Sequence, residues 1–211
     1  MADTFADQAE GLRRLHAAPL PGLCTVLSAD VGGDKAALMQ RLAASMMKRG
    51  RPVILIDAAG GDDRRPSLLD VARGDASLAE AAAVAANGVQ QVRLGADRDH
   101  PELSRLLRQL AGAQARVLVD AQLDDDGRLP LSLLSDGEMV VQLSAGSDSI
   151  RRAYEILQAL KQLCGRGSVS LLVTDTDPVR ANKARANLFH AASRYLALPV
   201  RSIVPQEARH V

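Results

Sequence analysis

The sequence predicts an α/β fold, a doubly wound and mostly parallel sheet flanked by helices. Short apolar runs alternate with longer amphipathic segments along most of the 211 residues, which is the order of strand–helix–strand units with right-handed crossovers. The composition is 47% hydrophobic but only 2% aromatic, so the core is aliphatic and suits parallel strands buried on both faces. A strand, a glycine-containing loop and Lys35 at the mouth of a helix complete the layout of a P-loop.

The N-terminal segment differs from the rest of the chain. Asp7 can cap a short helix over residues 8–16, with Leu12 and Leu15 on one face. The stretch Pro19-Leu20-Pro21-Gly22 cannot continue a helix. We therefore predict an arm with a linker at residues 1–22, followed by one α/β domain at residues 23–211.

Local signals set the elements of that domain. The apolar run 53–56 suits a strand buried on both faces, Gly50 closes the helix that precedes it, and Pro101 suits the first position of a helix. We expect strands at 23–28, 52–57, 89–94, 116–120, 138–143, 168–173 and 200–204. We expect helices at 35–49, 67–73, 77–86, 101–111, 148–164 and 178–197.

Bulk properties narrow the classes of function. The net charge of +1 gives no global field toward nucleic acid or acidic membranes, and the basic side chains of the last helix are interpreted as a solvated face (Arg180, Lys183, Arg185 and Arg194). The N-terminus lacks an apolar leader, and Cys24 and Cys164 suit reduced thiols of a cytoplasmic protein. The histidines lack zinc-ligand spacing and the acidic turn 124–127 lacks EF-hand spacing, so we expect no metal site.

Polar side chains follow several predicted strands. Asp30, Asp57, Asp120 and Thr174 stand at or just past strand ends. Ligands of doubly wound sheets bind outside the carboxyl ends of the strands. We therefore expect these four residues to converge near one crevice.

The loop before Lys35 departs from a working P-loop. Ala36 has no hydroxyl for magnesium, and Asp30 and Asp34 place carboxylates where phosphate would bind. Each carboxylate repels a phosphate charge a few ångström away by about 1–4 kcal/mol, depending on the local dielectric, and Asp30 or Asp34 can neutralise Lys35. We expect no cofactor, or ATP or ADP with magnesium at low affinity only.

In three kinds of match the chain resembles the MinD/ParA class of P-loop ATPases, and most closely its flagellar-number regulators of the FlhG/FleN type. Residues 7–13, DQAEGLR, are similar to the D-Q-A-x-x-L-R arm of those proteins, and residues 28–36, SADVGGDKA, align on the deviant Walker A pattern S-G-K-G-G-V-G-K-T. Segments 53–57, 117–120 and 171–174 occupy the places of the switch I, Walker B and base-recognition strands. The resemblance covers nearly the whole chain.

The resemblance also shows what this chain has changed. The family's signature lysine aligns with Asp30, two of its glycines with Val31 and Asp34, and its magnesium-binding threonine with Ala36. The second switch I carboxylate aligns with Ala59, and the asparagine that ends the base-recognition strand aligns with Thr174. The resemblance thus implies a vestigial nucleotide site, formed by Gly32, Gly33, Lys35, Asp57 and Asp120, in which Gly33 stands in the place of the family's valine.

For function, the resemblance implies a regulatory partner protein of flagellar biosynthesis. Its arm would engage the SRP-type GTPase FlhF and stimulate GTP hydrolysis, with Gln8 and Arg13 suited to act in trans. The partner-binding residues would be Asp7, Gln8, Ala9, Leu12, Arg13 and Leu15. Without the resemblance, the arm is interpreted as a solvated tail.

The remaining partners follow from the same resemblance. Other flagellar assembly proteins are candidates, whereas nucleic acid is not expected. The stretch 205–211 lacks the amphipathic helix by which MinD and FlhG bind membranes, so no stable membrane anchor is expected in this chain. With Asp30 in the signature position, a monomer or an ATP-independent dimer is expected.

Two alternative functions stay open. The chain could be an active ATPase switch with ATP-dependent dimerisation that controls flagellar number or placement. It could also be a MinD-like accessory protein of another envelope or secretion system.

Overall fold

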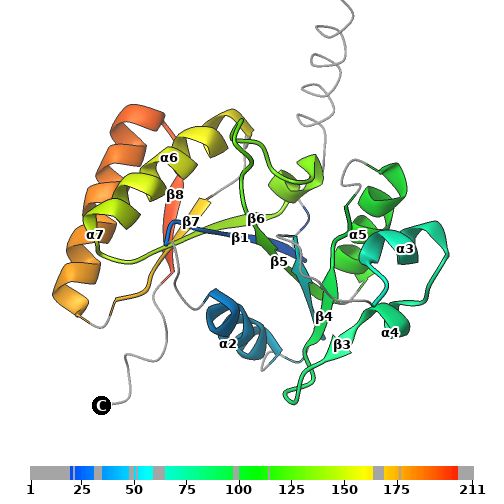
Figure 1. Cartoon of the computed structure of the whole chain (residues 1–211). Helices are drawn as coiled ribbons and strands as arrows, with labels where there is room; N and C mark the ends of the chain where they lie inside the picture. The colour runs from blue at the N-terminus through cyan, green and yellow to red at the C-terminus, as the bar shows by residue number, and fades with distance from the viewer. Residues whose placement is uncertain are drawn as a thin grey trace, which may run out of the picture.

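An eight-stranded sheet forms the centre of the computed structural model (Figure 1). The structure describes residues 20, 22–30, 35–47, 50, 52–58, 65–96, 100–113, 115–163, 169–175 and 177–203. The strands run in the order β3-β4-β2-β5-β1-β6-β7-β8, and all neighbours are parallel except β3 and β4. The predicted fold class, a mostly parallel sheet flanked by helices, is confirmed.

The strands are short and mostly apolar, as expected for a sheet covered on both sides. Their bounds are β1 Leu23–Ser28, β2 Val53–Asp57, β3 Ala83–Val84, β4 Gln90–Arg93, β5 Arg116–Ala121, β6 Glu138–Leu143, β7 Val169–Val173 and β8 Val200–Ile203. The helices are α2 Lys35–Met47, α3 Leu68–Arg73, α4 Leu78–Ala81, α5 Pro101–Ala113, α6 Ser147–Leu163 and α7 Pro178–Ala191. A 3₁₀ turn, η1, spans Ser132–Asp136, and a π-helical turn, η2, spans Ala192–Leu196.

The two faces of the sheet carry unequal layers (Figure 1). Alternate residues of β1 point to opposite faces, so Leu23 and Leu27 join the larger core, under α3, α5, α6 and α7. Cys24 and Val26 join the smaller core, under α2. Burial raises the pKa of the Cys24 thiol to about 12, with the charge of Glu138 adding to the rise and that of Arg116 opposing it.

Close packing extends to the end of the predicted linker. Leu20 packs against the larger core, and its N–H donates to the Asp136 carbonyl oxygen at 3.0 Å. A side chain at Gly22 would place its Cβ 1.9 Å from the Ala111 carbonyl oxygen, so this position requires glycine. The arm residues 1–19 lie outside the described residues, so the predicted arm and linker stay a prediction.

One predicted helix is wrong over half its length. Residues 77–86 were expected to form a helix, but α4 ends at Ala81, and β3 then pairs antiparallel with β4. Gly88 has φ +81°, and Asn87 Oδ1 accepts the Val89 N–H at 3.1 Å, which together close a tight hairpin. The Asn-Gly turn thus overrides the helical preference of the alanine-rich stretch.

Candidate functional site: the crevice after β1

The order of the strands places the first loop at the centre of the molecule. From β1 the chain crosses to β2, β4 and β5 on one side, and then returns to β6 on the other side of β1. The loop after β1 therefore leaves the sheet at its topological switch point, between the carboxyl ends of β5 and β6. Crevices at such points are where doubly wound sheets bind ligands.

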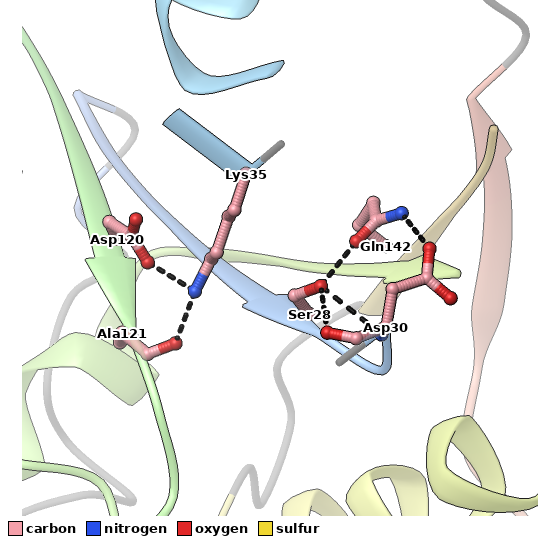
Figure 2. Close-up of polar contacts among 6 residues, drawn as sticks. All are labelled: Ser28, Asp30, Lys35, Asp120, Ala121 and Gln142. Atoms are coloured by element: carbon pink, nitrogen blue, oxygen red, sulfur yellow. Dashed lines mark hydrogen bonds and ion pairs between the residues drawn. The ribbon is translucent and has the colours of Figure 1, made fainter. Parts of the chain in front are cut away.

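On the β5 side of the crevice, Lys35 is held by an ion pair. It is the first residue of α2, and its Nζ contacts the carboxylate of Asp120 and donates to the Ala121 carbonyl oxygen at 3.0 Å (Figure 2). The side chains of Lys35 and Asp120 are 17% and 19% exposed. The expectation that Asp30 neutralises Lys35 is wrong, because Asp120 makes that contact; Asp34 lies outside the described residues.

Asp57 adds a second carboxylate beside Asp120. The two residues are register partners at the ends of the parallel strands β2 and β5. Burial raises the pKa of Asp120, the contact with Lys35 lowers it, and the charge of Asp57 raises it again, so its pKa lies above the ordinary value of 3.8. Two acids therefore lie side by side on this flank, and Lys35 contacts one of them, Asp120.

On the β6 side, Asp30 faces away from Lys35. Its Oδ2 accepts a hydrogen bond from Gln142 Nε2 at 2.7 Å, and its Oδ1 accepts from Ser144 Oγ at 2.8 Å and from the Ser144 N–H at 3.2 Å (Figure 2 for Gln142). Partial burial raises the pKa of Asp30, but hydrogen bonds from Ser149, Ser144 and Gln142 outweigh burial and hold that pKa below its usual value. Neutral donors thus stabilise this carboxylate in its charged form.

Gln142 is the centre of this second cluster. Its side chain lies within β6 and is almost fully buried, at 5% exposure. Its Oε1 accepts from Ser28 Oγ, and its Nε2 donates to Asp30 and to Thr174 Oγ1, the latter at 2.8 Å. Sequence analysis missed Gln142, although a lone polar residue in the apolar strand 139–143 was the available signal, since buried polar groups need partners.

A hollow of about 350 Å³ lies beside Asp30, at the start of α6. Its lining carries carboxylates from Asp30 and Asp148 and one cation, Arg152. Helix N-termini favour anions, but here the Asp30 carboxylate already accepts from the backbone of Ser144, just ahead of α6. The hollow is lined by Ala29, Asp30, Ser144, Gly146, Ser147, Asp148, Ser149 and Arg152.

The four residues predicted to converge near one crevice lie at the strand ends, but they form two clusters on either side of β1. Lys35 and Asp120 meet on the β5 side, with Asp57 beside them; Asp30 and Thr174 meet through Gln142 on the β6 side. The remaining predicted site and partner residues lie outside the described residues: Gly32, Gly33, Asp7, Gln8, Ala9, Leu12, Arg13 and Leu15.

The described part of the chain lacks two kinds of feature, a cluster of metal ligands and a membrane-spanning helix. Within those residues, no three or more His, Cys, Asp or Glu side chains group as metal ligands would. No helix in that part is long and apolar enough to span a bilayer.

The strand order defines a doubly wound α/β fold, and solved structures of MinD and ParA proteins share this fold. The MinD cell division protein of Aquifex aeolicus, in its MinC:MinD complex, is 18% identical over 88% of this chain and 82% of its own, with a TM-score of 0.64. A ParA family ATPase of Chlorobium tepidum is 15% identical over 90% of this chain and 86% of its own, with a TM-score of 0.56.

A third similar structure is the cobyrinic acid a,c-diamide synthase of Mycobacterium smegmatis with a bound ATP analogue and magnesium. It is 20% identical over 87% of this chain and 86% of its own, with a TM-score of 0.57. No protein-family model matches the chain, and no curated protein matches its sequence. At these identities the likeness establishes the fold, and the chemistry has to be argued from the site.

The described residues of the site fit a magnesium nucleotide poorly. Ala36 is exposed at the mouth of the crevice and has no oxygen to offer a metal. The ammonium group of Lys35 contacts Asp120 and the Ala121 carbonyl oxygen. A polyphosphate would have to break these contacts and approach Asp30, whose charged form the donors around it favour.

Proposed function

We propose that this chain is a regulatory partner protein of the FlhG type that acts without an efficient ATPase cycle. The observation that carries the proposal is that Lys35 and Asp30 both have internal partners: Lys35 contacts Asp120, and Asp30 is held by Gln142 and Ser144. In a working P-loop the lysine is the ligand of the phosphates. The α/β domain then serves as a stable platform, and the activity resides in the arm.

The same proposal assigns the arm to FlhF. Asp7, Gln8, Ala9, Leu12, Arg13 and Leu15 would engage this SRP-type GTPase, with Leu12 and Leu15 as apolar anchors in a groove of the partner. Gln8 and Arg13 carry the groups that orient water and neutralise phosphate charge in other GTPases. This assignment is supported by the resemblance of residues 7–13 to the D-Q-A-x-x-L-R arm.

The nucleotide part is tested by calorimetry on the full chain with magnesium and ATP. We expect no binding in the micromolar range, because the acidic crevice repels phosphate. The double variant Asp30→Lys with Ala36→Thr should gain measurable affinity, since it removes one repulsive charge and restores a hydroxyl. Micromolar binding by the wild type would refute this part of the proposal.

The arm is tested with a peptide of residues 1–18 added to FlhF. We expect the peptide to raise the GTPase rate, Gln8→Ala to reduce stimulation more than binding, and Leu12→Ala to reduce binding itself. Introduced into the full chain, neither change should shift the melting temperature much if the arm lies outside the core. An unchanged GTPase rate, or a core-like destabilisation by Leu12→Ala, would refute the assignment.

An active MinD-like ATPase switch is the second candidate. It is favoured by Lys35, Asp57 and Asp120 at the carboxyl edge of the sheet and by the synthase of the same fold that binds an ATP analogue and magnesium. A shift from monomer to dimer on addition of ATP, measured by light scattering, would establish this candidate and overturn the first. A flagellar gene neighbourhood would separate the first proposal from an accessory role in another envelope or secretion system.

A further inference from the structure

The outer face of α7 is a second candidate binding surface of the chain. Helix α7 and the π-helical turn η2 that continues it are buried along a single narrow stripe, formed by Ala184, Leu188, Ala192 and Leu196. The helix packs beside α6 at the outer edge of the helical layer (Figure 1). Most of its surface therefore faces solvent.

A seam of coiled-coil spacing runs along this exposed face. Val179, Asn182, Ala186, Phe189 and Ser193 follow one another at alternating steps of three and four residues, the a and d spacing of a helix that packs on another helix. Val179 is 73% exposed and Phe189 is 48% exposed. We call these five residues the α7 seam.

The α7 seam contains a hollow. A shallow hollow of about 520 Å³ lies along it, lined by Asn182, Arg185, Ala186, Phe189, His190 and Ser193. Ala186 and Ser193 are small and flank the ring of Phe189 along the helix, which leaves room for an incoming side chain. Holes bordered in this way receive the knobs of a partner helix.

The charges beside the seam have one sign. Residues 178–196 include Arg180, Lys183, Arg185 and Arg194 but no Asp or Glu, although the whole chain is balanced at 26 basic and 25 acidic residues. Lys183 directly flanks the seam, at a position that chooses the partner's charge in a coiled coil. A partner helix that lies here gains from carboxylates at its own flanking positions.

We propose that the α7 seam binds an acidic amphipathic helix of a partner protein. A second copy of the same face would oppose like charges along its length, which disfavours self-pairing. The phosphates of duplex nucleic acid could bind the basic side chains of α7, but the duplex would not cover the apolar side chains of Val179 and Phe189. This inference revises the solvated-face interpretation of this helix and is independent of the proposed nucleotide and arm functions.

The test uses the full chain and a synthetic helical peptide of about three heptads, with Leu at a and d and Glu at e and g. A second peptide with Lys in place of Glu is the matched probe. We expect fluorescence anisotropy to show binding of the acidic peptide, weakened by added salt, and none of the basic peptide. Equal binding of both peptides, or of neither, overturns the proposal.

Variants of the chain locate the binding. Phe189→Ala should weaken the acidic peptide by about tenfold or more, since central aromatic residues dominate such interfaces. Tyr195→Ala is the control, because this ring is 64% exposed on η2, near the Arg194 guanidinium but off the seam; it should change affinity less than twofold. Circular dichroism establishes that both variants are folded, and equal effects of the two variants overturn the proposal.

The competing occupants are tested with the same proteins. Duplex DNA of random sequence should bind more weakly than the acidic peptide and should not be displaced by it. Light scattering of the wild type and of Phe189→Ala should show the same oligomeric state. Displacement of tightly bound DNA by the peptide, or a dimer that Phe189→Ala dissociates, would assign the face to nucleic acid or to a second copy and overturn the proposal.

Discussion

Each flank of β1 contains an acid that is held by internal contacts, Asp120 on the β5 side and Asp30 on the β6 side, and the two acids are stabilised by different means. On the β5 flank, Asp120 is paired with the cation Lys35 but lies beside a second acid, Asp57. On the β6 flank, Asp30 is surrounded by the neutral donors Gln142 and Ser144. The pKa values of the two acids accordingly move in opposite directions, upward for Asp120 and downward for Asp30.

This difference determines which internal contacts a ligand would have to replace on each flank. If Lys35 moved to another anion, the Asp120 carboxylate would be left partly buried and uncompensated, so ligand binding on the β5 flank carries that cost. The Asp30 carboxylate is bound by neutral donors and has no cation to release, and its donor Gln142 also donates to Thr174 and accepts from Ser28. The β6 flank is therefore a structural brace, and it should be the costlier flank to disrupt.

The largest effect is expected from Gln142→Leu. This change leaves Asp30, Ser28 and Thr174 each short of a hydrogen-bond partner in a partly buried cluster, and should lower the free energy of unfolding by about 2–4 kcal/mol. Urea denaturation of the wild type and the variant measures this change in the free energy of unfolding. The control is Gln91→Leu, at an exposed position in β4, with an expected change within about 0.5 kcal/mol. If the two variants are equally stable, the hydrogen bonds of Gln142 do not contribute to the stability of the fold.

A smaller effect is expected on the β5 flank from Lys35→Met. Removing the cation leaves Asp120 charged, partly buried and next to Asp57, and should cost about 1–3 kcal/mol of unfolding free energy at neutral pH, reduced by the exposure of the pair. Adding Asp120→Asn should recover part of that loss, because the uncompensated charge disappears. Additive losses in this double-mutant cycle would mean that the two side chains are not energetically coupled.

The smallest effect is a difference in pH dependence between the two acids. Because the pKa of Asp30 is lower in the folded state, its carboxylate contributes stability at pH values above 3.8 that is lost as the pH falls below that value. Because the pKa of Asp120 is higher in the folded state, its contribution is lost as the pH rises from 3.8 through the folded pKa.

The Asn variants of the two acids make that difference measurable by denaturation across the acid range. The stability advantage of the wild type over Asp30→Asn should shrink on acidification. The stability advantage of the wild type over Asp120→Asn should instead shrink as the pH rises. Two curves of the same slope would contradict the opposite assignments of the two flanks.

Much of the fold follows from the sequence because local and global signals agree. The run Leu23–Ser28 is apolar, short and bounded by turn residues, and β1 has the predicted bounds; the same holds for β6, Glu138–Leu143. The helix that begins at Pro178 is also confirmed, with Asp177 Oδ1 accepting the Val179 N–H at 2.8 Å as a cap. Its final turn, however, is π-helical over Ala192–Leu196, and no residue in the sequence signals this change.

The site was predictable in its location but not in its pairings. Strand ends converge by topology, so the neighbourhood of Asp30, Asp57 and Asp120 follows from the strand assignment. Which carboxylate neutralises Lys35 depends on how the loop after β1 turns between β5 and β6, and pattern alone does not encode that turn. Gln142 was missed because a residue inside a strand was treated as core, whereas the buried donors and acceptors of the crevice need it.

Chemical labelling of the buried Cys24 thiol can report local opening of the sheet. Cys24 lies in β1, between β5 and β6, and with a pKa near 12 it holds almost no reactive thiolate while the strand stays in place. In a Cys164→Ser background, labelling by a thiol reagent then requires that β1 leave its neighbours. The labelling rate then reports how often the centre of the sheet opens by local unfolding. A ligand or partner that stabilises the closed sheet should lower that rate.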